Sequence, residues 1–226
     1  MRFVAAERGG ARRIIFWRHG RTDWNARGLF QGQEDIPLDE LGRQQAREAA
    51  AELAHLAPAR VVSSDLARAA DTAAELASLT GLTVKLDSRI RETYAGHWQG
   101  LAFADIASRF PLDQAAWHGG DPQVLAGGGE SRVDVGRRMA EATLEAVATL
   151  GAGETLVVAS HGGSIRAGLA VLMGLPPELW SSLSGVSNCH WSVLEELDRG
   201  LNDRQMWQLT EHNVGLSSMP STPLEG

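Results

Sequence analysis

Two short apolar runs, far apart along the chain, stand out from its pattern of hydrophobic and polar positions. Residues 14–17 read Ile-Ile-Phe-Trp and residues 156–159 read Leu-Val-Val-Ala, with no turn residue in either run. Runs of this length, bounded by polar residues and glycines, are typical of buried strands. A histidine and a glycine follow soon after each run, so each predicted strand leads directly into a loop.

Helical and strand patterns alternate along most of the remaining chain. Further strands are predicted at 60–63 and 82–86, and two later ones at 188–197 and 205–210. Four longer helices are predicted. The first spans 40–56 with Asp39 as its N-cap, and the second runs to Leu79 with Ser64 or Asp65 as its N-cap. The third runs to about residue 150 with Ser131 as its N-cap, and the fourth spans 164–173. This order predicts a three-layer α/β/α fold with a mostly parallel sheet and an antiparallel edge strand.

The middle of the chain is less regular. A short helix over 103–110 is predicted to stop at Pro111, and a glycine-rich connection follows over 119–129. We therefore expect one domain over 13–212, with a cap insertion at about 103–129. Residues 1–12 are expected to form a flexible extension, and 213–226, rich in Ser and Pro, a disordered tail.

Composition narrows the class of partner. The 226 residues carry a formal net charge of -7, which disfavours nucleic acid as a partner because nucleic-acid binders present a basic face. The longest apolar stretch is too short to span a membrane, and residues 1–12 do not have the pattern of a signal peptide. Cys189 is the only cysteine, which excludes an intramolecular disulfide and predicts a reducing, cytoplasmic location.

The end of the first apolar run carries candidate chemistry. His19 lies between Arg18 and Gly20, with Arg21 close behind. Ligands of open α/β sheets bind beyond the carboxyl ends of the strands. His19 is therefore a candidate nucleophile in an anion pocket; the alternative is a histidine that is hydrogen-bonded locally between solvated arginines.

His161 repeats this arrangement after the second apolar run, and a helix is predicted to start at once. The free N–H groups of that helix start favour an anion nearby. Arg68 lies in the first turn of another helix, where a cation opposes the helix dipole by up to ~1 kcal/mol, unless an anion binds between them. Arg166 repeats this argument more weakly, and the alternative for Arg68 is an ion pair with Asp65 or Asp71.

Glu92 opens the loop that follows the third predicted strand. A single carboxylate among histidines and arginines can act as a general acid or base. A surface salt bridge is the alternative for this residue.

Taken together, these residues resemble the histidine phosphatase (phosphoglycerate mutase-like) superfamily. The resemblance extends from about Arg13 to Glu195, in order and at the usual spacing. It is carried by Arg18-His19-Gly20, Asn25, Gln31-Gly32, Leu41-Gly42, residues 63–69, Arg91-Glu92, residues 96–100, Gly129-Glu130-Ser131 and Ser160-His161-Gly162.

The resemblance implies a phosphomonoester hydrolase that acts through a phosphohistidine on His19 and needs neither a metal nor a cofactor. Glu92 is implied as the acid and base, and Arg18, Arg68 and His161 as the groups that stabilise the transferring phosphoryl group. The implied phosphate-binding residues are Arg18, Asn25, Gln31, Gly32, Arg68 and Gly162. Arg21 and Trp117 are further candidates for substrate binding.

The sequence after Glu92 differs from the Arg-His-Tyr-Gly that is usual in cofactor-dependent mutases, so it favours the phosphatase branch. The segments Arg89–Leu101, Gly129–Val135 and Leu183–Trp191 are similar to superfamily members that act on glucosyl-3-phosphoglycerate. The expected partner is a small phosphorylated metabolite, and the resemblance leaves a homodimer open. A broad-specificity phosphatase, a mutase and an inactive scaffold of the same fold are the alternatives.

Overall fold

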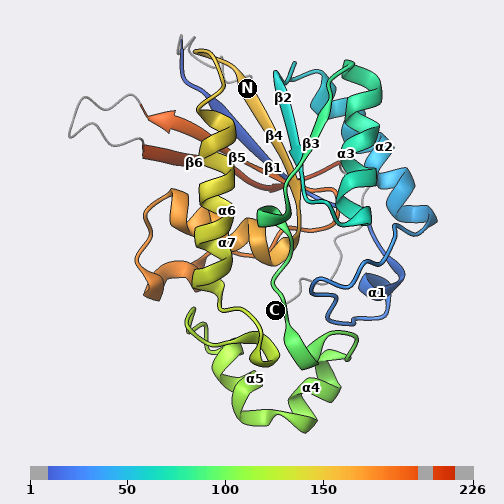
Figure 1. Cartoon of the computed structure of the whole chain (residues 1–226), viewed down its shortest axis with the longest axis vertical. Helices are drawn as coiled ribbons and strands as arrows, with labels where there is room; N and C mark the ends of the chain where they lie inside the picture. Colours follow the sequence, from blue (N-terminus) through green and yellow to red (C-terminus); the bar gives the residue numbers. More distant parts are fainter. Residues whose placement is uncertain (1–9, 198–205, 217–226) are drawn as a thin grey trace.

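The computed structural model describes residues 10–197 and 206–216, and its centre is a six-stranded sheet in the order β3-β2-β4-β1-β5-β6 (Figure 1). Strands β1 to β4 pair in parallel, whereas β5 runs antiparallel to both β1 and β6. The predicted fold class is confirmed, with two antiparallel strands at one edge. The strands are β1 Arg13–Arg18, β2 Arg60–Ser63, β3 Val84–Leu86, β4 Thr155–Ser160, β5 Trp191–Leu197 and β6 Met206–Val214.

Strand β1 lies in the middle of the sheet, and helices cover both of its faces. Ile14 and Phe16 pack with α6 and α7 on one face, and Ile15 and Trp17 pack with α2 and α3 on the other. Burying such a side chain contributes roughly 1.5–3 kcal/mol, so the apolar run holds the strand in this position. The covering helices are α2 Glu40–Ala54, α3 Ala67–Thr80, α6 Arg132–Val147 and α7 Gly162–Leu172.

Two of the predicted helix caps are confirmed and one is wrong. Asp39 accepts a hydrogen bond from the Gly42 N–H at the start of α2, and Ser131 accepts one from Asp134 at the start of α6. The N-cap of α3 is Leu66, which makes no side-chain cap. Ser64 and Asp65 were predicted for that role, but both side chains are used elsewhere.

The cap insertion lies beyond the carboxyl ends of the parallel strands, at the lower end of the molecule in Figure 1. It contains α4 Phe103–Arg109, α5 Pro111–His118 and the short 3-10 helix η3 Ala126–Gly128. The predicted stop at Pro111 is correct for α4, but a second helix begins there. Proline is favoured at the first position of a helix, because the N–H group that it lacks would be unpaired there.

Other short elements complete the described chain. They are α1 Asp23–Ala26, η1 Ser88–Ile90, η2 Gly96–Trp98 and η4 Pro177–Ser182. Strand β6 extends to Val214, two residues into the segment that was predicted as a tail; residues 1–9 and 217–226 of the predicted termini lie outside the described residues.

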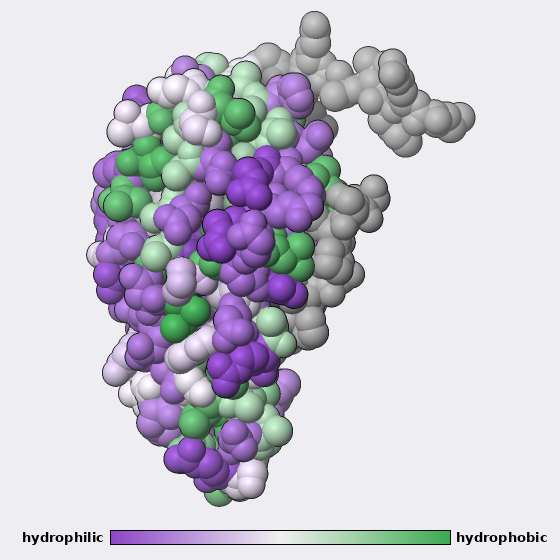
Figure 2. All heavy atoms as spheres, turned by 90° about the vertical axis from the view of Figure 1, so that its right-hand side faces the viewer, coloured by the Kyte–Doolittle hydropathy of each residue, from purple (hydrophilic) through white to green (hydrophobic). Residues whose placement is uncertain are grey.

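None of the helices in the described ranges is long and apolar enough to cross a membrane. The face seen in Figure 2 is mostly hydrophilic, with hydrophobic residues scattered between polar ones.

Candidate active site

The two strand-end histidines meet at one edge of the sheet. Strands β1 and β4 are adjacent and in register, with Arg18 opposite Ser160, so His19 and His161 leave the sheet at the same level. The His19 N–H donates to the Ser160 carbonyl over 3.0 Å, and the ring centroids of the two histidines are 5.1 Å apart. Both side chains are buried.

The hydrogen bonds of His19 fix its tautomer. Its Nδ1 lies 2.7 Å from the Gly20 carbonyl oxygen, which can only accept, so Nδ1 carries the proton. The lone pair is then on Nε2. Burial, followed by the nearby charges of Arg68 and Arg18, holds the pKa of His19 well below its ordinary 6.5. The ring is therefore a neutral nucleophile near pH 7.

The loop after β1 is held by close backbone packing. A Cβ on Gly20 would collide with the carbonyl oxygen of Gly42 in α2, so the two backbones touch. The Gly20 N–H donates to the Thr72 hydroxyl, and the Asn188 amide donates to the His19 carbonyl oxygen over 3.0 Å. His19 is thus positioned by β1, α2, α3 and the turn before β5.

His161 is held differently, because both of its ring nitrogens have partners. Arg68 donates through Nε to Nδ1 over 3.2 Å, so Nε2 carries the proton and donates to the Ser64 hydroxyl at 2.9 Å. Burial, followed by the charge of Arg68, lowers the pKa of His161 well below 6.5. His161 is a neutral hydrogen-bonded neighbour of His19.

Two arginines bring positive charge into this buried edge. Arg68 is fully buried, and besides His161 it donates to the carbonyl oxygens of Gly32 and Glu34. Arg18 donates to the Val186 carbonyl over 2.7 Å, and its guanidinium lies against Gly162. Of the two carboxylates considered as ion-pair partners of Arg68, Asp65 pairs with Arg91 instead.

Glu92 is buried at the first turn of α7 rather than in a surface salt bridge. Its carboxylate accepts hydrogen bonds from the backbone N–H groups of Gly163 and Ser164, each over 3.0 Å, and from Thr93 over 2.7 Å. The Gly162 N–H, one residue earlier, makes no hydrogen bond to any residue of the described ranges. The start of α7 therefore presents an amide donor beside an acid–base group.

Arg138 on α6 fixes the loop that carries Glu92. It donates to the carbonyl oxygens of Arg89, Arg91 and Glu92 and forms an ion pair with Glu130. Arg138 was not predicted from the sequence.

The remaining predicted site residues divide into two groups. Gln31 and Asn25 lie close by: the Gln31 side chain accepts from Thr22, and the Asn25 Oδ1 accepts from Asn188. Arg21 instead pairs with Asp39 over 2.7 Å, and it does not line the pocket beside Arg18. Trp117 does line that pocket.

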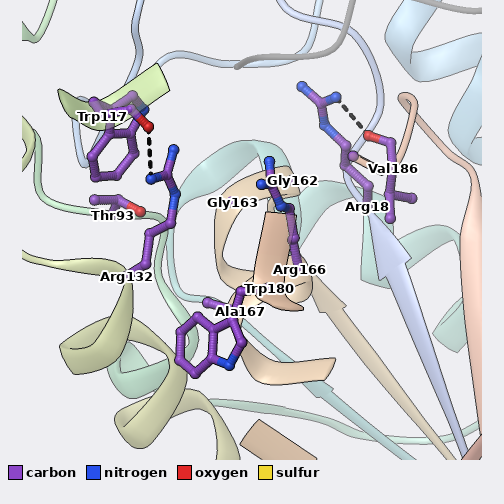
Figure 3. Close-up of a pocket in the computed structure, with 11 residues that line it drawn as sticks. Arg18, Thr93, Trp117, Arg132, Gly162, Gly163, Arg166, Ala167, Trp180 and Val186 are labelled. Atoms are coloured by element: carbon purple, nitrogen blue, oxygen red, sulfur yellow. Dashed lines mark hydrogen bonds between the residues drawn. The ribbon is translucent and has the colours of Figure 1, made fainter. Parts of the chain in front are cut away.

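This pocket contains two further arginines, Arg132 from α6 and Arg166 from α7 (Figure 3). Arg132 was not predicted from the sequence. It is the first residue of α6, so it also places a cation where it opposes the helix dipole, which is the signal that identified Arg68. The described residues include no group of three or more His, Cys, Asp or Glu side chains that could hold a metal ion.

Comparisons with known proteins agree on one family. The model of the histidine phosphatase superfamily (branch 1) matches residues 14–210. Glucosyl-3-phosphoglycerate phosphatase of Mycobacterium tuberculosis is 45% identical in an alignment of 191 residues, and the match covers 81% of this chain and 85% of that protein. A probable phosphoglycerate mutase, GpmB of Yersinia pestis, is 35% identical over 80% of this chain and 84% of its own length.

A solved structure of mycobacterial glucosyl-3-phosphoglycerate phosphatase in complex with VO3 has a TM-score of 0.83 and 41% identity to this chain. The match covers 90% of this chain and all of that one.

Proposed function

The chain belongs to the histidine phosphatase superfamily and is a phosphatase, and from this premise we propose that His19 is the nucleophile. The observation that carries this role is the 2.7 Å contact of Nδ1 with the Gly20 carbonyl, which leaves the lone pair on Nε2. The low pKa of His19, caused first by burial, keeps that lone pair available near pH 7.

The reaction has two displacements at phosphorus. In the first, His19 Nε2 attacks the phosphorus atom, the bond to the ester oxygen breaks, and protonated Glu92 gives its proton to the leaving alcohol. In the second, the Glu92 carboxylate takes a proton from water, whose oxygen attacks the phosphorus atom. The P–N bond then breaks, and inorganic phosphate leaves.

Charge on the phosphoryl oxygens is stabilised by the groups around His19. We assign this role to Arg18, Arg68, His161 and the Gly162 N–H, with Asn25, Gln31 and Gly32 completing the phosphate site. Donors held in place in a buried site need little reorganisation during the reaction, which makes them effective. Two of them are anchored by neutral acceptors: Arg68 by the Gly32 carbonyl and Arg18 by the Val186 carbonyl.

We propose glucosyl-3-phosphoglycerate as the substrate. The support is the 45% identity to the mycobacterial phosphatase of that name and the presence of a cap beside the site. In this proposal Trp117 does not stack directly on the sugar ring, because its side chain is buried against Trp98 and Phe30. The segment around it would set the shape of the pocket instead.

The test compares three substrates by kcat/KM: glucosyl-3-phosphoglycerate, 3-phosphoglycerate and p-nitrophenyl phosphate. We expect glucosyl-3-phosphoglycerate to exceed 3-phosphoglycerate by ~10-fold or more, which is ~1.4 kcal/mol of transition-state binding. Equal values would identify a broad-specificity phosphatase, and formation of 2-phosphoglycerate from 3-phosphoglycerate would identify a mutase.

We also propose a cytoplasmic location, where the buried thiol of Cys189 remains reduced. Burial raises the pKa of this thiol, so it is a poor nucleophile. Size-exclusion chromatography of the purified chain tests the homodimer that the family resemblance leaves open.

A further inference from the structure

A second cationic pocket adjoins the site at His19. It is bounded by Arg18, Gly162 and Gly163 on the side of the proposed phosphate site. Arg132 and Arg166 extend into it in the same direction, with Arg18 beyond them (Figure 3). The proposed reaction at phosphorus uses neither Arg132 nor Arg166.

Arg166 lacks a partner among the described residues. Its Nε is buried and makes no hydrogen bond, and the guanidinium forms no ion pair within the described ranges. Burial lowers its pKa. Arg166 is only partly exposed, and a buried Nε–H without an acceptor costs free energy, so this group is placed for a ligand rather than for stability.

Arg132 is more firmly held and forms no ion pair within the described ranges, although the charge of Asp121 nearby partly offsets its own. Only 9% of it is exposed, one Nη donates to the Trp117 carbonyl at 3.0 Å, and the guanidinium lies 3.5 Å from the centre of the Trp117 ring. Burial, and then repulsion from Arg166, lowers its pKa to about 10. Two repelling cations in one pocket are stabilised when an anion binds between them.

We infer that Arg132 and Arg166 bind a carboxylate of the substrate, whose phosphate is bound at the same time by Arg18, Arg68 and His161. This inference rests on the proposed function and extends it to a substrate class: phosphorylated carboxylic acids with the two groups a few bonds apart. Arg18 and Gly162 border both subsites, so one small molecule can reach both.

The apolar lining of the pocket favours a carboxylate over a second phosphate. Trp117 stacks on one face of the Arg132 guanidinium, whose N–H donors lie in its plane and can bind the oxygens of a carboxylate or of a phosphate. Ala167 and Trp180 line other parts of the pocket with apolar surface, which offers nothing to further phosphate oxygens.

The experiment compares 3-phosphoglycerate with glycerol 3-phosphate, which has a hydroxymethyl group in place of the carboxylate. We expect wild type to prefer 3-phosphoglycerate by ~10-fold or more in kcat/KM, and Arg166→Gln to reduce that preference to ~2-fold or less. Arg166→Lys should restore part of the preference. Arg137→Gln is the matched control, because Arg137 is an exposed arginine of α6 that pairs with Asp134.

A preference in Arg166→Gln that equals that of wild type would overturn the inference, as would a wild type that does not distinguish the two substrates. A higher kcat/KM for 1,3-propanediol bisphosphate, which has no carboxylate, than for 3-phosphoglycerate, lost in Arg166→Gln, would overturn the carboxylate in favour of a second phosphate.

Failure of the proposed function has a different result: wild type would hydrolyse none of the esters. Calorimetric binding of 3-phosphoglycerate and glycerol 3-phosphate to wild type and Arg166→Gln then tests the subsite alone. Arg132→Lys tests the second cation in the same assays. Because Arg132 packs on Trp117, the melting temperature of this variant is compared with that of wild type first.

Discussion

His19 and His161 occupy equivalent places at the ends of neighbouring strands, yet their hydrogen bonds differ. His19 donates from Nδ1 to a carbonyl and makes no hydrogen bond from Nε2 to a described residue, whereas both nitrogens of His161 are engaged by Arg68 and Ser64. The same motif thus yields one ring with an available lone pair and one ring that is a fixed donor. The identity of the hydrogen-bond partner, rather than the residue type, separates a nucleophile from its helper.

The comparison also limits where the proton for the leaving group can come from. Burial lowers the pKa of both histidines well below 6.5, so both rings are neutral near pH 7 and neither supplies a proton readily. Glu92 is the buried carboxyl group beside them. The two histidines and Glu92 therefore have three different tasks.

The largest expected effect distinguishes the two histidines directly. His19→Ala should lower kcat on p-nitrophenyl phosphate by at least ~10³-fold because it removes the nucleophile, whereas His161→Ala removes one stabilising donor and should cost ~10²-fold. A quench at alkaline pH should trap a base-stable, acid-labile phosphoenzyme in wild type and in His161→Ala. Phosphoenzyme in His19→Ala would contradict the assignment.

A smaller effect is expected for Glu92→Gln, and it depends on the leaving group. This variant keeps the shape of the side chain but cannot donate the proton, so alkyl phosphates should lose ~10²-fold in kcat/KM while p-nitrophenyl phosphate loses far less. The measurement is kcat/KM for both esters at one pH, because kcat also contains the hydrolysis of the phosphohistidine, which is common to both esters. Arg138→Gln is a useful companion, since Arg138 positions the loop of Glu92 and should lower kcat/KM for alkyl phosphates more than for p-nitrophenyl phosphate, by less than Glu92→Gln does. Equal losses of kcat/KM in Glu92→Gln would remove Glu92 from the acid role.

The smallest effect concerns stability at acidic pH. A histidine that is buried as the neutral form binds its proton more weakly in the folded state than in the unfolded state. Its contribution to the free energy of unfolding is therefore unchanged above pH 6.5. It then falls by up to ~1.4 kcal/mol per pH unit as the pH drops below 6.5 toward the lower folded-state pKa.

Two such histidines should make wild type acid-sensitive, and His161→Gln should remove about half of this sensitivity. Urea unfolding of both proteins at pH 7.5 and 5.5 measures it. An equal loss of stability in wild type and variant would mean that His161 is not buried as the neutral form.

The sheet and the catalytic edge could be predicted from sequence because both rest on local patterns. The apolar runs before His19 and His161 specify central strands, and the carboxyl ends of parallel strands necessarily meet at one edge. Arg68 was identified because its first-turn position is electrostatically unfavourable. Each of these signals lies within a few residues of the side chain that it identifies.

The second pocket could not be assembled in this way. Arg132 and Arg166 lie on different helices, and their shared pocket depends on how α6 packs against α7 and the cap. The same holds for Asn188, which donates to the His19 carbonyl from the turn before β5. Contacts between distant segments are set by packing and leave no periodic trace in the chain.

The central position of β1 has a consequence for the chain during its synthesis. Its two sheet neighbours, β4 and β5, begin about 140 and 170 residues after β1 ends. At a translation rate of about 5–20 residues/s, the Ile-Ile-Phe-Trp segment waits roughly 7–30 s for its first partner strand. The ribosome thus synthesises the chain through β4 before the phosphate site can exist. Of the described strands, the one that carries the proposed nucleophile waits longest for a partner.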